Sequence, residues 1–165
     1  MPEVWTPPTF DDIATSETVT AAYLNQLGNS LRFLKEVNYT AFTGDVTVTA
    51  VTVGTAVQVV SSGPITYENV PHLVEFYCPI VGTAAETYVI VRDSTTVIGT
   101  LGRVFGNGPV SLQWRVTPTA ASHTYNIAAW RASAGTTTFN AGSGGTAGND
   151  TTDLAGFIRI TRRPT

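Results

Sequence analysis

Charge is the scarcest property of this sequence. Only 13% of its 165 residues are charged, and Lys35 is the single lysine; soluble domains usually carry roughly 25% charged residues. The 9 basic residues do not outnumber the 12 acidic ones, so the chain lacks the concentrated basic face that nucleic-acid binding needs. Lysine side chains lose much entropy when they are covered. Their scarcity therefore fits a subunit that is packed in an assembly.

Cysteine and histidine are also nearly absent. Cys78 stands alone, which excludes an intrachain disulfide, and its apolar neighbours in the sequence predict a buried small hydrophobe. His72 and His123 have no partners at metal-ligand spacing. The sequence therefore predicts no metal site and no other cofactor.

Targeting segments and catalytic motifs are missing too. No run of 18 apolar residues exists, so no membrane insertion is expected. The N-terminus lacks the basic and apolar regions of a signal peptide, which predicts synthesis in a cytoplasm without export by that route. No nucleophile elbow, P-loop or dinucleotide fingerprint occurs. Asp11 and Asp12, and likewise Asp150 and Asp153, are typical of turns and caps. We therefore expect a protein that is not an enzyme.

Threonine takes the place of the missing charges, with 28 residues in the chain. It is β-branched and packs well on a pleated, half-buried surface. From residue 38 to residue 165, short alternating segments follow one another with turn residues between them and no crossover helix. This pattern predicts a mainly β fold, an antiparallel β-sandwich or jelly roll of about eight strands.

Some of these strands can be placed individually. Residues 110–116 alternate between apolar and polar side chains, and residues 123–131 are expected to return beside them as a hairpin. Residues 70–78 are apolar at nearly every position, which predicts burial on both faces. The GNGP sequence at 106–109 predicts a turn, and residues 141–150 predict a flexible, exposed loop.

Residues 1–19 are predicted to form an extended N-terminal anchoring arm. Pro7 and Pro8 favour extended backbone. Trp5 and Phe10 are large apolar side chains on a segment that has no core of its own. They need cover, either from the same chain or from a groove of a partner, and both alternatives stay open.

Residues 20–37 are predicted to form one amphipathic helix. Its leucines repeat at spacings of 3, 4 and 3 residues, namely Leu24, Leu27, Leu31 and Leu34. The stripe either self-associates, for example as a three-fold bundle, or packs on its own β-domain. Gly28 lies within the segment and weakens a free helix, so both alternatives stay open.

Several aromatic residues lie in or beside the predicted strands, and some of them must face outward. Aromatic rings on a hydroxyl-rich β-surface bind sugars or proteins by stacking and edge hydrogen bonds. Tyr67, Tyr125 and Trp130 are the candidate ligand-facing residues; Tyr77 and Tyr88 belong to the same set. Core packing is the alternative role for each.

The N-terminal motifs carry a resemblance to a known group of proteins. Residues 5–10 (WTPPTF), 20–27 (TAAYLNQL) and 31–34 (LRFL) resemble the start of many small tailed-bacteriophage virion proteins, in which an aromatic-proline arm leads into a T-A-x-x-L-N helix. The β-part resembles the jelly-roll domains of phage minor tail, tail-fibre and head-decoration proteins. Residues 116–125 and 156–160 carry that second similarity.

The resemblance implies a virion structural role, with synthesis in the host cytoplasm and location in the virion, often as a homotrimer with a tumour-necrosis-factor-like fold. The first expectation is a tail-associated fibre or minor tail subunit that binds a receptor. A head-decoration protein that stabilises the capsid is the alternative, and a carbohydrate-binding β-sandwich module is the second alternative. The expected partners are other virion proteins, of the tail or the capsid, and a host-surface carbohydrate.

Overall fold

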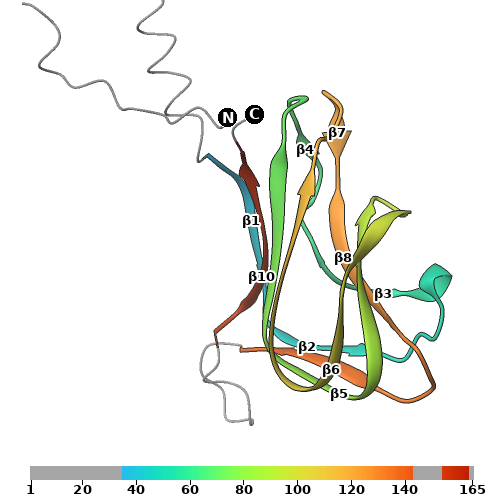
Figure 1. The fold of residues 1–165 in the computed structure, drawn as a ribbon. Helices are drawn as coiled ribbons and strands as arrows, with labels where there is room; N and C mark the ends of the chain where they lie inside the picture. The colour runs from blue at the N-terminus through green and yellow to red at the C-terminus, as the bar shows by residue number, and fades with distance from the viewer. Residues whose placement is uncertain (1–34, 143–153, 164–165) are drawn as a thin grey trace, which may run out of the picture. The chain divides into compact units, whose positions relative to one another are not determined.

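The computed structural model describes residues 35–142 and 154–163, which fold into antiparallel β-structure (Figure 1). The mainly β, antiparallel sandwich predicted from the sequence is confirmed. The predicted arm, residues 20–34 of the predicted helix and nearly all of the glycine-rich segment lie outside the described residues. The end of that helix was predicted wrongly, because Glu36 and Val37 belong to the first strand, Glu36–Phe42. No helix in the described part is long and apolar enough to cross a membrane.

Ten strands and one short 3-10 helix make up the described residues. They are β1 (Glu36–Phe42), β2 (Gly44–Val48), η2 (Val53–Thr55), β3 (Val57–Ser61), β4 (Ile65–Thr66), β5 (His72–Asp93), β6 (Thr96–Val116), β7 (Ser122–His123), β8 (Tyr125–Arg131), β9 (Thr137–Ala141) and β10 (Gly156–Arg162). Eight of the strands form one sheet, and β4 pairs with β7 as a separate ribbon.

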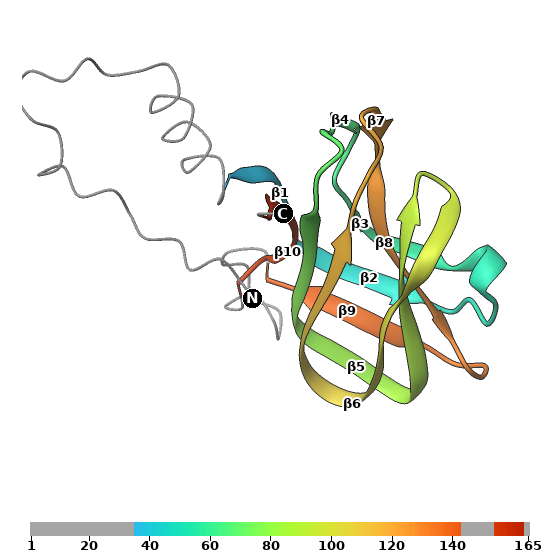
Figure 2. The same ribbon diagram turned by 45° about the horizontal axis from the view of Figure 1, so that its top comes forward.

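β5 and β6 set the architecture because they are 22 and 21 residues long. They pair along their whole length and bend in the middle, so the halves of this hairpin lie in two facing layers (Figure 1). Layer A has the order β1, β10, first half of β5, second half of β6. Layer B has the order β3, β8, second half of β5, first half of β6. β2 and β9 lie side by side across the bend, where β9 pairs with β5 (Figure 2).

The turn expected at residues 106–109 is wrong, because β6 continues through this segment. The glycines allow the strand to bend without ending: Gly106 has a φ of 81° and Gly108 a φ of 153°, a region that costs glycine little. β5 has register shifts over the same stretch. A glycine-rich segment that resembles a hairpin turn in the sequence is therefore the place where the chain passes from one layer to the other.

Two further expectations about strands are corrected. Residues 123–131 do not form a hairpin with residues 110–116, because β8 pairs with β5 and β3 in layer B. Residues 72–78 are not buried on both faces; Leu73, Glu75 and Tyr77 are half-buried between buried neighbours. Alternation identifies a strand, but the partner of a strand and the cover of its outer face are set by distant segments.

The core lies between the layers. Phe76 packs between Phe42 and Phe139, with ring centroids 6.3 and 6.0 Å away. Cys78 is fully buried, as predicted, and burial raises the pKa of its thiol to about 12. The thiol lies 3.2 Å from the Ile80 carbonyl oxygen and acts as a small core side chain.

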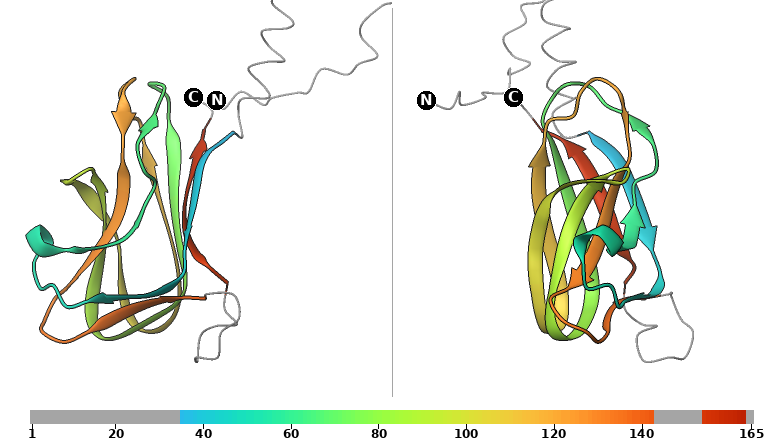
Figure 3. Two further views of the ribbon diagram at one scale, coloured as in Figure 1. Left: turned by 180° about the vertical axis from the view of Figure 1, so that it is seen from behind. Right: turned by 90° about the vertical axis from the view of Figure 1, so that its right-hand side faces the viewer.

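β6 differs from β5, its long partner, in burial. Its six inward apolar residues pack against the core, but none of its 21 residues is buried. They are Leu101, Val104, Val110, Leu112, Trp114 and Val116. Within the described residues β6 pairs only with β5, so its other edge is free. In the right panel of Figure 3, the yellow and amber β6 runs along one side and the blue β1 along the other.

Candidate functional site

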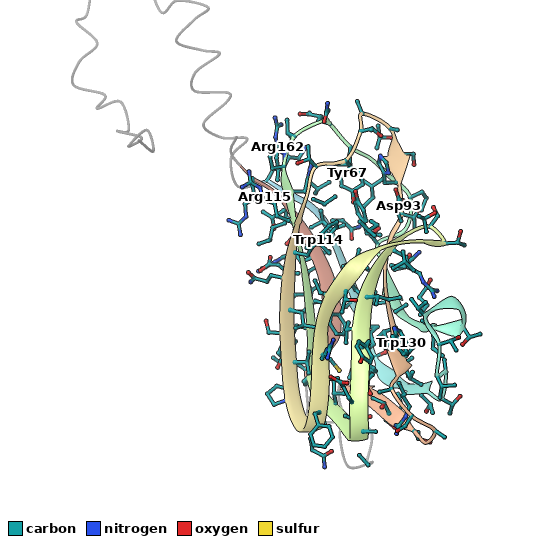
Figure 4. The ribbon with its side chains drawn as sticks, turned by 45° about the vertical axis from the view of Figure 1, so that its right-hand side comes forward. Tyr67, Asp93, Trp114, Arg115, Trp130 and Arg162 are labelled. Carbon is teal, nitrogen blue, oxygen red and sulfur yellow. The ribbon has the colours of Figure 1, made fainter. Side chains whose placement is uncertain are left out.

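Two of the three rings expected to face a ligand are buried instead. Tyr67 and Tyr125 are 3% and 1% exposed and pack edge to face at 5.4 Å. Burial raises the pKa of both hydroxyls, that of Tyr125 to about 12. Figure 4 shows Tyr67 near Asp93 at the end of the sandwich marked by β4 and β7 in Figure 1. These rings fill the space where the two layers diverge, and sequence alternation could not reveal that.

Trp130, the third expected ring, belongs to a closed stack on the outer face of layer B. Its ring lies parallel to Tyr88, with centroids 4.2 Å apart and planes 6° apart. Arg103 covers the other face of Tyr88 at 4.7 Å. Glu86 accepts hydrogen bonds from Arg103 and from the Tyr88 hydroxyl, both at 3.0 Å. Since both faces of Tyr88 are occupied, this stack offers no free ring face at its centre.

The remainder of that outer face is covered by the connection between β2 and β3. Ala56 packs with Ile90 and Ala128, and Trp130 lies against this small cluster. Arg92 donates hydrogen bonds to the carbonyl oxygens of Val53 at 2.8 Å and Ala56 at 3.2 Å. Tyr88 and Trp130 are therefore engaged in packing.

Layer A presents its aromatic residues differently. Tyr39, Phe157 and Tyr77 come from β1, β10 and β5, three neighbouring strands. Ring centroids are 5.2 Å apart between Tyr39 and Phe157, and 5.6 Å apart between Phe157 and Tyr77. Tyr39 is 50% exposed, and the other two rings are half-buried. We call this continuous apolar surface the aromatic strip.

A row of polar side chains borders the aromatic strip on the same face. Arg159, Glu75 and Gln113 occupy directly opposite positions on β10, β5 and β6. Arg159 Nε donates to one Glu75 oxygen at 2.8 Å, and Gln113 Nε2 donates to the other at 3.1 Å. The hydrogen bond to Glu75 raises the pKa of Arg159. We call these three residues the polar row; each side chain is fixed by its neighbour.

Tyr39 and Phe157 are not among the residues predicted to face a ligand, although the sequence indicates that the Phe157 side chain points outward. β10 alternates between buried and half-buried residues, so Phe157 and Arg159 point to the side opposite Ile158 and Ile160. That alternation is visible in the sequence. What it could not reveal is that Tyr39 and Tyr77 lie on either side of Phe157, because the three residues belong to distant segments.

A second polar cluster lies at the end of the sandwich near Tyr67. His123 Nδ1 is 2.5 Å from Asp93 Oδ2, and His123 Nε2 is 3.0 Å from Thr119 Oγ1. This is the carboxylate, imidazole and hydroxyl order of hydrolase triads. Here Nε2 also lies 3.2 Å from the Thr119 carbonyl oxygen, and Thr124 N donates to Asp93. The cluster therefore ties the β5–β6 turn to the segment before β8.

The remaining expected site residues can be placed briefly. The anchor residues Trp5, Pro7, Pro8, Phe10, Leu24, Leu27, Leu31 and Leu34 all lie outside the described residues. Across residues 35–142 and 154–163, no group of three histidine, cysteine or acidic side chains could hold a metal ion.

Comparisons with known proteins give little beyond the fold. No protein-family model matches the chain, and no curated protein matches its sequence. Among solved structures, it is similar to a carbohydrate-binding module from Cellvibrio mixtus lichenase 5A, solved in complex with cellotriose. The identity is 13%, the match covers 81% of this chain and 94% of that chain, and the TM-score is 0.42. A similarity of this size says nothing about what this chain binds.

Proposed function

We propose that this protein is a non-catalytic carbohydrate-binding β-sandwich and that the outer face of layer A is its binding surface. The observation that carries the proposal is the aromatic strip beside the polar row. Pyranose rings have C–H faces that pack on aromatic rings, and hydroxyl groups that pair with fixed donors and acceptors. Binding sites commonly combine an apolar lining with a few well-placed polar groups.

The dimensions of the face suit a short stretch of a sugar chain. The aromatic strip crosses three strands, so it is about 10 Å long at the usual strand spacing. The polar row lies two residues along β10 and β5 from Phe157 and Tyr77, a distance of roughly 7 Å, and Tyr39 lies directly opposite Arg159 in that same row. A sugar ring stacked on the exposed Tyr39 thus has its hydroxyl groups within reach of Arg159 and Glu75; Arg159 itself lies over the Phe157 ring at 5.8 Å.

The test is retention of the full chain on a panel of insoluble and soluble polysaccharides, followed by calorimetry with an oligosaccharide of the class retained. Tyr39→Ala removes the most exposed ring of the strip and should weaken binding about fivefold, since one aromatic contact contributes on the order of 1 kcal/mol. Phe105→Ala is the matched control, because Phe105 is 77% exposed on β6 and is not part of the strip.

Two results would overturn the proposal. One is the absence of retention on every polysaccharide. The other is a Tyr39→Ala variant that binds as tightly as the wild type while the Phe105→Ala control behaves normally. Thermal unfolding of both variants establishes that each is folded.

A role as a bacteriophage virion surface protein is the second candidate, supported by the WTPPTF and TAAYLNQL motifs of the N-terminal segment. In that role residues 1–19 anchor the chain, and the β-domain displays its carbohydrate-binding face to the host. Copy number in purified particles tests it: a handful of copies fits a tail subunit, and hundreds fit head decoration. Absence from particles, or unchanged particle binding after deletion of residues 1–19, contradicts the anchored arrangement.

A further inference from the structure

β6 has one edge that is unpaired within the described structure. Three of the seven exposed large hydrophobic residues lie in the first half of β6: Val97, Ile98 and Phe105. β6 carries two arginines and no acidic residue. A hollow of about 310 Å³ opens at its bend, lined almost entirely by β6. Natural proteins usually protect long edge strands with charges, prolines or a covering segment; β6 has its two arginines and Pro109, and within the described residues no strand covers its outer edge.

The opposite edge of layer A is β1, and the two edges match in direction. Each neighbouring pair across layer A is antiparallel, so β1 and the second half of β6 also run in opposite directions. A second copy placed beside the first in the same orientation brings its β6 alongside β1 as an antiparallel neighbour. Layer A then continues from one copy into the next with antiparallel pairing, which accommodates the irregularity that β1 has between Glu36 and Asn38.

The two edges also match in charge. One row of layer A runs through Glu36, Thr161, Leu73 and Arg115 as directly opposite positions. Glu36 and Arg115 are its two ends, both exposed, and neither forms an ion pair within the described residues. Figure 4 shows Arg115 at the outer side of β6. In the continued layer, Glu36 of one copy lies opposite Arg115 of the next.

We propose that copies of this chain associate side by side through β1 of one copy and β6 of the next. The contact pairs the outer edge of β1 with the unpaired edge of the second half of β6 and joins Glu36 to the neighbour's Arg115. The row that contains Tyr39 ends at Gln113, so the neighbour's Gln113 comes to lie beside Tyr39 at the aromatic strip. Such a head-to-tail contact forms a ring when its rotation closes.

The experiment is sedimentation velocity on the full chain over a wide range of concentrations. The wild type should sediment as a multiple of 17.5 kDa. Glu36→Arg and Arg115→Glu should each weaken association about tenfold, because like charges then meet across the new strand pair. The double variant Glu36→Arg, Arg115→Glu reverses both charges and should regain most of the lost association.

Arg163→Glu is the matched control, since it makes the same charge change just beyond β10, which is not an edge strand; it should associate as the wild type does. A monomeric wild type at all concentrations overturns the proposal. So does an oligomer whose mass does not respond to the single variants, or a double variant no better than either single one. Polysaccharide retention is measured separately, so a monomer that binds sugar overturns this inference and leaves the proposed function standing.

Discussion

Gly156 is where the packing of layer A can be tested most sharply. It is the first residue of β10, directly opposite Phe42 on β1 and next to Phe157 of the aromatic strip. A Cβ added there would overlap Cε1 and Cζ of the Phe42 ring and would lie 3.0 Å from the Tyr77 carbonyl oxygen. We therefore predict that Gly156→Ala destabilises the β-domain, because a backbone oxygen on one side prevents a simple shift and a core ring must move on the other.

The size of the effect follows from these contacts. Overpacking a well-packed site costs typically 1–3 kcal/mol. Displacing Phe42 also disturbs its stacking on Phe76, which adds about 0.5–1.5 kcal/mol. Alanine recovers roughly 0.5–1 kcal/mol because it loses less backbone freedom than glycine in a strand. The net cost is about 2 kcal/mol, which lowers the Tm of a domain of this size by roughly 5–10 °C.

The measurement is thermal unfolding followed by circular dichroism, with urea unfolding as a second probe. Gly99→Ala is the matched control, because Gly99 also lies in a strand and a Cβ there meets no atom within 4 Å. Its Tm should stay within about 2 °C of the wild type. Phe42→Leu in the Gly156→Ala background removes the overlapping ring atoms and should recover part of the lost stability.

The reasoning fails if Gly156→Ala unfolds at the same temperature as Gly99→Ala. It also fails if Phe42→Leu has the same effect with and without Gly156→Ala, since residues in contact should show non-additive changes in the free energy of unfolding.

Two other predictions concern Cys78 and Asp93. The folded-state pKa of Cys78 is raised from 9.0 to about 12. Its contribution to stability is therefore complete below pH 9 and is lost as pH rises toward 12, by up to about 1.4 kcal/mol per pH unit. Urea unfolding between about pH 8 and about pH 11 should show a shallower loss of stability with pH in Cys78→Ala than in the wild type, and an identical pH slope contradicts the prediction. Asp93→Asn removes the charged partner of His123 and should lower the stability of the folded domain by about 1–2 kcal/mol. The backbone amide of Ser94, which donates to the Thr124 carbonyl oxygen, should then exchange its hydrogen faster. Unchanged exchange would show that Asp93 does not hold this turn.

The class of fold was determined by local chemistry. Many threonines, short alternating segments and turn residues favour antiparallel strands at almost any register, so the mainly β sandwich could be predicted before any pairing was known. The burial of Cys78 could also be predicted, because the residue lies in an apolar segment, where a lone thiol behaves as a small hydrophobic side chain. The pattern of β10 likewise contained the outward direction of Phe157.

Pairing and cover could be decided only by the tertiary structure. The glycines at positions 106 and 108 permit a bend as well as a turn, and the long pairing of β6 with β5 selects the bend. Tyr125 and Trp130 lie on one strand, but the first fills the end of the core and the second stacks on Tyr88. A strand pattern specifies two faces and leaves open which elements cover each of them. The aromatic strip exists because Tyr39, Phe157 and Tyr77, from distant segments, are brought side by side by the register of three strands.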